Sequence, residues 1–239
     1  MPSSGKIFIV PDEKGLDAIE LAVENFKESE RDEDLGLDLI NDITHLRRGE
    51  FGLSGIYAYD YTVSHYYRGN FIVSPTTQEC PFTFLQDDEK MWLIVYCSKG
   101  IADRVANKLS EIIYGDVGEI KLAKIRSHEI DDYLKTNYET RVIFVEDMDT
   151  PSINKSTLYG KDFLQTRLFA QIRGSGSPRY VVTKSKARGY TVGIVNDGAI
   201  VLFNQVDNSD FQAFLEDEIL PIIHVIKQTK LATNPASKV

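Results

Sequence analysis

A short segment near the C-terminus places the strongest constraint on the fold of this chain. Residues 190–195 read YTVGIV and residues 199–203 read AIVLF, with Asn196, Asp197 and Gly198 between them. An Asp-Gly pair tolerates the positive φ that a tight hairpin turn requires. The segment therefore predicts two adjacent antiparallel strands.

Other segments show the same two periodicities, two for strands and 3.6 for helices. The polar runs at 28–34 and 147–157 are expected to be connectors, because they are rich in charged or turn-forming residues. Further strands are expected at residues 6–10, 56–62, 70–74, 82–86, 91–97, 118–125, 142–146, 163–173 and 179–184. Helices are expected at 16–28, 37–46, 100–114, 128–137 and 208–227, the last with Asn208 or Ser209 as its N-cap.

These elements predict an α+β protein in which antiparallel β-meanders are each followed by a helix. Two such units, near residues 82–114 and 190–224, align at an offset that stays close to 108–110. An internal duplication explains this offset, and convergence on a common arrangement explains it equally well. Two units could form a saddle-like sheet, by analogy of architecture with TATA-binding proteins, or a two-layer sheet/helix arrangement. The expected division is 1–150, 151–228 and a disordered tail at 229–239.

The composition of the chain limits the classes of function that it can have. The 239-residue chain has a formal net charge of −9, which opposes wholesale binding to a polyanion but leaves room for a local basic site. No apolar run is long enough to span a bilayer, and the N-terminus lacks the features of a secretory signal, so no membrane partner is expected. Two cysteines make neither a disulfide framework nor a zinc site. A soluble, intracellular protein is the default expectation.

One stretch of the acidic chain is locally basic. Residues 163–196 contain no Asp or Glu but hold Arg167 and five further cations on or beside expected strands. If residues 163–173 and 179–184 pair, these cations lie along a β-ribbon that could contact the phosphates of DNA or RNA. The alternative is that they protect an exposed edge strand from aggregation. The five cations are Arg173, Arg179, Lys184, Lys186 and Arg188.

A second stretch is dense in tyrosine. Residues 55–69 read GIYAYDYTVSHYYRG, and the first three tyrosines share one face of a strand because side chains alternate. Tyrosine offers large contact area at low entropic cost, so it suits protein interfaces and stacking on bases. The alternative is a sheet face covered by a helix. The predicted interface residues are Tyr57, Tyr59, Tyr61, Tyr66 and Tyr67.

Catalytic motifs are weak throughout the chain. The four histidines are scattered and form no recognised ligand pair, and neither cysteine sits in a nucleophile motif. GSGSP at 174–178 lacks the Lys-Ser/Thr of a phosphate-binding loop. The best acidic group is Glu146, Asp147 and Asp149, which could bind Mg²⁺ at a strand end but lacks a recognisable partner lysine.

The sequence thus favours a non-enzymatic binding or assembly protein without cofactor or metal. It would use the tyrosine-rich face for a protein partner or for self-association, and the basic ribbon for DNA or RNA. One rival interpretation is a metal-dependent nuclease or phosphodiesterase centred on Glu146, Asp147 and Asp149. A third is a purely structural subunit of a protein complex.

Overall fold

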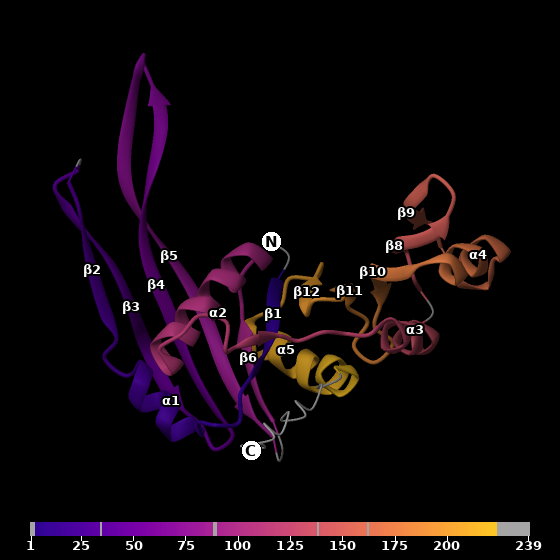
Figure 1. Ribbon diagram of the computed structural model, residues 1–239, viewed down its shortest axis with the longest axis horizontal. Helices are drawn as coiled ribbons and strands as arrows, with labels where there is room; N and C mark the ends of the chain where they lie inside the picture. The colour runs from indigo at the N-terminus through magenta and orange to yellow at the C-terminus, as the bar shows by residue number, and fades with distance from the viewer. Residues whose placement is uncertain (1–2, 34, 88–89, 138, 162, 224–239) are drawn as a thin grey trace, which may run out of the picture.

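The chain folds around one long, open antiparallel sheet (Figure 1). The computed structural model describes residues 3–33, 35–87, 90–137, 139–161 and 163–223. The order across the sheet is β2-β3-β4-β5-β6-β1-β12-β11-β10-β8-β9, and β7 pairs with β1 beside this path. The strands are β1 (Ser3–Val10), β2 (Lys27–Asp32), β3 (Leu37–Arg48), β4 (Gly52–Tyr67), β5 (Asn70–Gln86), β6 (Met91–Val95), β7 (Lys121–Leu122), β8 (Val142–Thr150), β9 (Ile153–Tyr159), β10 (Ser177–Lys184), β11 (Thr191–Val195) and β12 (Ala199–Leu202).

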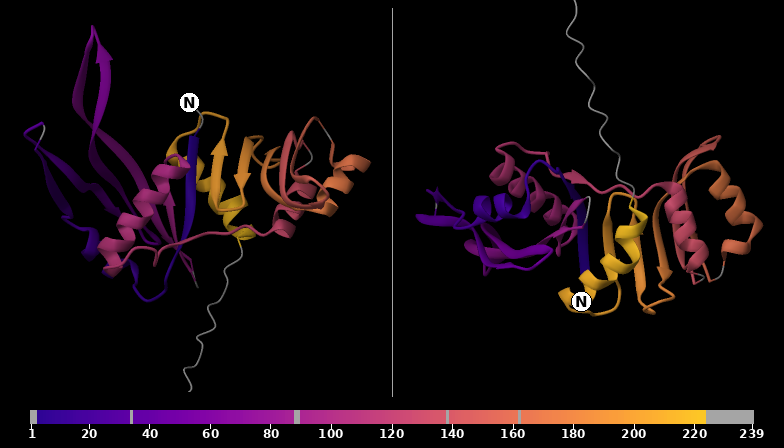
Figure 2. Two further views of the ribbon diagram at one scale, coloured as in Figure 1. Left: turned by 45° about the horizontal axis from the view of Figure 1, so that its top comes forward. Right: turned by 90° about the horizontal axis from the view of Figure 1, so that it is seen from below.

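Helices cover opposite faces of the two halves of the sheet. The first core packs Phe8 of β1 with helices α1 and α2, whereas the second packs Ile7 with α3 and α5. Successive strand residues point to opposite faces, so β1 contributes to both cores. Figure 2 shows α1 and α2 at one end of the molecule and α3 and α4 at the other. The helices are α1 (Leu16–Val23), α2 (Lys99–Tyr114), α3 (Ser127–Thr136), α4 (Arg167–Ser175) and α5 (Asn208–Phe214).

Several sequence predictions are confirmed. The hairpin at the Asn-Asp-Gly turn joins β11 and β12, and Gly198 has a φ of +84°. The strand at residues 6–10 is β1, and the helices at 100–114 and 128–137 are α2 and α3. The C-terminal helix begins where expected, but its N-cap is Asp207, whose carboxylate accepts a hydrogen bond from the Asp210 backbone N–H at 2.8 Å. The predicted tail lies outside the described residues.

Two N-terminal predictions are wrong. The helix expected at 37–46 is strand β3, and the connector expected at 28–34 contains edge strand β2. In β3 a bulge between Thr44 and Arg47, with His45 at a φ of +53°, shifts the alternation of side chains. The bulge places Ile43 and Leu46, three residues apart, in the same core, which is a spacing typical of a helix. In β2 every side chain is at least partly exposed, so no apolar pattern marks the strand.

Three predictions in the second half of the chain also fail. The strand expected at 163–173 is a 3-10 turn followed by α4, which Thr166 caps by accepting a hydrogen bond from the Phe169 N–H at 3.2 Å. The linker expected at 147–157 forms the β8–β9 hairpin. The strand expected at 118–125 is reduced to the two residues of β7.

The two meander-and-helix units both occur, as β5-β6-α2 and β11-β12-α5, on either side of β1. The residue correspondence behind the predicted duplication does not hold, because Trp92 faces away from α2 whereas its predicted counterpart Ile200 faces α5. The duplication is therefore not confirmed, although the order of elements in the two units is the same. The predicted boundary between 150 and 151 falls at the tip of the β8–β9 hairpin.

Candidate functional site

The most distinctive feature is a long β-hairpin that projects from the N-terminal half of the sheet (Figures 1 and 2). Strands β4 and β5 pair from Gly52–Leu85 to Tyr67–Asn70, whereas β3 pairs with β4 only as far as Tyr59. Beyond that point the hairpin is a two-stranded ribbon. We refer to residues 61–76 of this ribbon as the arm.

The arm has a rigid base and a tight tip. At the base, the Asp60 carboxylate accepts hydrogen bonds from the Ile40 backbone N–H at 2.9 Å and from the Thr77 hydroxyl at 2.6 Å. At the tip, Arg68 and Gly69 have φ values of +48° and +89°. Positive φ at both central residues is the signature of a type I′ turn, whose twist matches that of the flanking strands.

Apolar side chains are exposed on both faces of the arm. Tyr66 is 67% exposed and Phe71, its cross-strand partner, is 77% exposed, with ring centroids 5.4 Å apart. Tyr67 and Ile72 are exposed on the opposite face, since they alternate with Tyr66 and Phe71 along their strands. No residue of the arm is buried in the chain. An apolar surface of this kind normally marks an interaction site.

The structure divides the predicted tyrosine face in two. Tyr61, Tyr66 and Tyr67 lie exposed on the arm, but Tyr57 and Tyr59 are buried in the core beneath α2. For Tyr57 and Tyr59 the alternative interpretation holds, because a helix covers the sheet face on which they lie. Sequence reasoning also missed Phe71, Ile72 and Val73, because a run of consecutive apolar residues is typical of a buried strand.

The buried tyrosines are structural. Burial raises the pKa of Tyr57 to about 12, against the opposing charge of Lys108. Burial also raises the pKa of Tyr59, although Arg104 opposes this shift by stacking over the ring at 5.4 Å and donating a hydrogen bond to the hydroxyl at 3.3 Å. Their neutral phenols are therefore maintained by the packing of α2 on the sheet.

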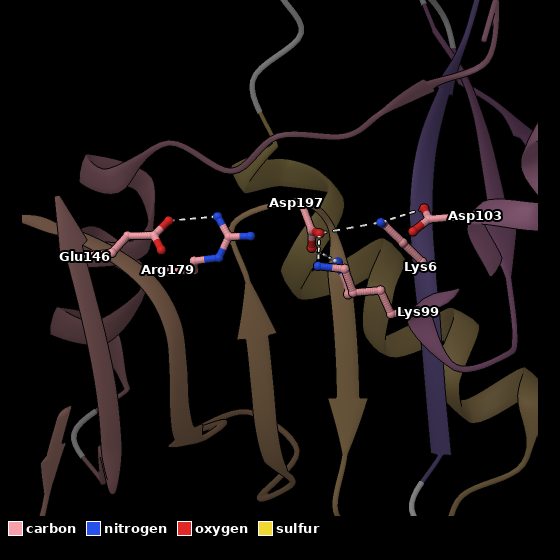
Figure 3. A network of polar contacts seen from close by, with 7 residues as sticks. Lys6, Lys99, Asp103, Glu146, Arg179 and Asp197 are labelled. Carbon is pink, nitrogen blue, oxygen red and sulfur yellow. Dashed lines mark hydrogen bonds and ion pairs between the residues drawn. The ribbon is translucent and has the colours of Figure 1, made fainter. Parts of the chain in front are cut away.

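The predicted basic residues do not form a continuous ribbon. Arg173 lies on α4 and donates to both carboxylate oxygens of Asp131, at 2.7 and 2.5 Å. Arg179 pairs with Glu146 at 2.7 Å (Figure 3). The remaining three surround the β10–β11 turn, where Lys184 lies 3.5 Å from Glu139, Arg188 pairs with Asp217, and Lys186 is exposed. Arg173, Arg179, Lys184 and Arg188 thus each have a carboxylate partner.

One of the two glycines of GSGSP serves packing. A Cβ on Gly176 would lie 2.7 Å from the Glu146 carbonyl oxygen and 2.8 Å from a Val145 methyl group, whereas nothing lies within 4 Å of a Cβ on Gly174. Residues 174–178 form the end of α4 and the start of β10. Gly176 therefore allows α4 to approach β8 closely.

The acidic group at the end of residues 142–146 also has a structural setting. Glu146 is engaged by Arg179, and Asp147, with a φ of +55°, lies in the irregular part of the β8–β9 ladder. Asp149 follows on the same strand. Within the described ranges, no three His, Cys, Asp or Glu side chains are grouped so that they could hold a metal ion.

A shallow groove that the sequence did not indicate lies on the face of the sheet opposite α3 and α5. Its volume is about 540 Å³, which falls in the range of ligand sites, but it is broad and open. Its aromatic residues come from three segments that are separated in sequence, so no local pattern predicts it. The lining includes Arg141, Tyr159, Tyr180, Thr191 and Phe203.

A charged cluster lies at the centre of the sheet (Figure 3). Lys6 of β1, with only 1% of its side chain exposed, contacts Asp103 of α2 at 2.6 Å and Asp197 of the β11–β12 turn at 3.5 Å. Lys99 also pairs with Asp197. Burial acts to raise the pKa of Asp197, but Lys99 and Lys6 outweigh it and hold this pKa below its ordinary value. The cluster is charge-balanced and joins three elements.

No protein-family model matches this chain, and no curated protein matches it significantly. Within the described ranges, none of the helices combines the length and the apolar character needed to cross a bilayer.

Proposed function

We propose that this protein is a non-enzymatic binding and assembly protein, and that the arm inserts into a groove of a protein partner. The observation that supports this proposal is the exposure of aromatic and aliphatic side chains on both faces of a two-stranded ribbon. An isolated hairpin is marginally stable in water, and its open strand edges invite pairing. A partner that encloses the arm would satisfy both the apolar side chains and the strand edges.

Charge favours a second copy of this chain as the partner. The arm contains Arg68 and His65 but no acid, so all 36 acidic residues lie outside it. Two bodies of net charge −9 repel each other at long range, but the arm itself contains no acid, so its contact with the acidic surface of a second copy is not opposed locally. Self-association through the arm is therefore the first form of assembly to test.

Nucleic acid is a weaker candidate. Binding to a phosphate backbone increases with the number of cations that neutralise phosphates, and the arm contributes one arginine. Arg173, Arg179, Lys184 and Arg188 already have carboxylate partners, which compete with phosphates. The metal-dependent nuclease is disfavoured in the same way, because Arg179 engages Glu146.

Sedimentation velocity over a range of protein concentrations tests the proposal. The test variant carries Tyr66→Ser and Phe71→Ser, which remove the aromatic pair of the arm. The control carries Leu21→Ser, since Leu21 is 76% exposed on α1 and matches Phe71 in exposure but lies away from the arm. Loss of an aromatic anchor at an interface costs about 2 kcal/mol or more, or roughly 30-fold in Kd.

We expect the wild type and the control to associate as concentration rises, and the arm variant to remain a monomer. Circular dichroism should show that all three proteins are folded. Equal association of the wild type and the arm variant would contradict the proposal and favour the purely structural subunit. A wild type that stays monomeric at every concentration would reject a second copy as the partner.

A further inference from the structure

The two cysteines of the chain lie opposite each other on neighbouring strands. The β5–β6 register pairs Phe82 with Val95, and the Tyr96 backbone N–H donates to the Pro81 carbonyl oxygen at 2.9 Å. The next position along this register places Cys80 opposite Cys97. Since Pro81 and Tyr96 occupy a hydrogen-bonded position, the cysteines occupy a non-hydrogen-bonded one.

This position has the geometry that a disulfide requires. In non-hydrogen-bonded antiparallel pairs the Cα atoms approach to about 4.5 Å. A disulfide spans Cα separations of about 4.4 to 6.8 Å. Cys80 and Cys97 are both free thiols in this structure, and the register places them opposite each other on neighbouring strands.

The two thiols have different environments. Cys80 is completely buried, whereas Cys97 is partly exposed just before the start of α2. A hydrogen bond between the two sulfurs raises the pKa of Cys80, to which burial adds, and the same bond lowers the pKa of Cys97. Cys97 is thus the thiol that solvent can reach and that more readily forms the nucleophilic thiolate.

We propose that Cys80 and Cys97 form a reversible dithiol–disulfide site whose substrate is a low-molecular-weight disulfide, with Cys97 as the attacking thiol and Cys80 as the resolving thiol. The site is independent of any binding by the arm. It is assigned from the cross-strand pairing and from the difference in exposure between the two sulfurs.

The reaction is a thiol–disulfide exchange in two steps. The Cys97 thiolate attacks one sulfur of the small disulfide, which forms a mixed disulfide and releases one small thiolate. The Cys80 sulfur then attacks the Cys97 sulfur, and its proton passes to a released thiolate. The bond between the two protein sulfurs forms, and the second small thiol leaves. Two electrons move from the protein to the small disulfide, which becomes two thiols.

The new bond would join two parts of the N-terminal half. Cys80 pairs with Tyr57 of β4 on its other side, so it belongs to the strand that continues into the arm. Cys97 immediately precedes Ser98, the N-cap of α2. Oxidation would therefore tie the base of the arm strand to the start of the helix that covers Tyr57 and Tyr59.

Intact-mass spectrometry of the native, reduced protein after exposure to glutathione disulfide tests this site. We expect the wild type to lose two hydrogen atoms, to remain a single chain on a non-reducing gel, and to accumulate no mixed disulfide. The Cys80→Ala variant should instead hold a stable mixed disulfide at Cys97. The Cys97→Ala variant should stay reduced while it is folded, because Cys80 is buried.

In denaturant, both single-cysteine variants should form the mixed disulfide, which shows that each thiol is chemically competent. Peptide mapping of the wild type at early times, after acid quenching, covers the case in which a variant fails to fold. It should find the first glutathione on Cys97. The proposal is overturned if the wild type keeps both thiols, if its mixed disulfide persists, or if Cys80 reacts first.

Discussion

Lys6 illustrates how a single residue holds this fold together. A buried ammonium group is costly unless it is paired and hydrogen-bonded. Asp103 and Asp197 supply that pairing from α2 and from the β11–β12 turn. The turn is close to β1, as a Cβ on Gly198 would lie 2.9 Å from the Ile7 carbonyl oxygen. One buried lysine thus links the central strand to a helix of the first meander unit and to the turn of the second.

The charge on Asp197 predicts a pH dependence of stability. Its pKa is lower in the folded protein than in the unfolded chain, so the unfolded chain binds more protons in acid. The stabilisation is complete above the unfolded pKa and is lost as pH falls through the folded pKa. Chemical denaturation between about pH 5 and pH 2 should show a steeper fall in unfolding free energy for the wild type than for Asp197→Asn. Asp12→Asn, at an exposed position, is the control; parallel curves for the wild type and Asp197→Asn would contradict the prediction.

At the scale of elements, the helices and strands that the sequence predicts correctly are those with a clear local pattern of residues. Helices α2 and α3 each bury one stripe, β1 is a short apolar run buried on both faces, and an Asn-Asp-Gly turn marks the β11–β12 hairpin. Strands β2 and β3 escape prediction because an exposed edge and a bulge remove that pattern. The candidate site was predicted only in part. Tyr66 and Tyr67 were identified, but the burial of Tyr57 and Tyr59 depends on α2, which is distant in sequence.

The arm should be dispensable for folding. Since none of its residues is buried, a shortened arm should leave the core intact. Tyr67 and Asn70 flank the native turn, and Tyr61 and Thr76 form a cross-strand pair six residues further from it. Because hydrogen-bonded and non-hydrogen-bonded pairs alternate along the ladder, the two pairs are of the same kind. Replacing residues 62–75 with Asn-Gly therefore preserves the geometry of a two-residue hairpin. We expect a thermal midpoint within a few degrees of the wild type by circular dichroism, corresponding to less than about 1 kcal/mol. A large loss of stability would show that the arm packs on the body.

At the scale of the whole molecule, β1 is the joint between the two halves. It pairs with β6 on one side and β12 on the other, and its alternating side chains enter both cores. Sharing a strand in this way couples the stability of the two halves. The chain should therefore unfold as one cooperative unit.

A substitution at Gly5 tests this coupling. A Cβ at Gly5 would lie 2.7 Å from the Phe211 ring, so Gly5→Val should overpack the contact between β1 and α5 and cost about 1–3 kcal/mol. Trp92 fluorescence and far-ultraviolet circular dichroism should shift together in a denaturation curve. Gly100→Ala is the control, because nothing lies within 4 Å of the added methyl group. Two separate transitions would show that the halves unfold independently.

The two edge strands of the sheet differ in their charge. Strand β2, KESERD, carries charge at five of its six positions, whereas β9, INKSTLY, carries only Lys155. Charged side chains on an edge strand discourage pairing with another chain, so β2 is better protected than β9. Growth of a fibre by edge-to-edge pairing needs both edges of every molecule, so a protected β2 edge opposes such growth even where the β9 edge is open. The unequal charge of the two edges is thus a protection against amyloid-like aggregation.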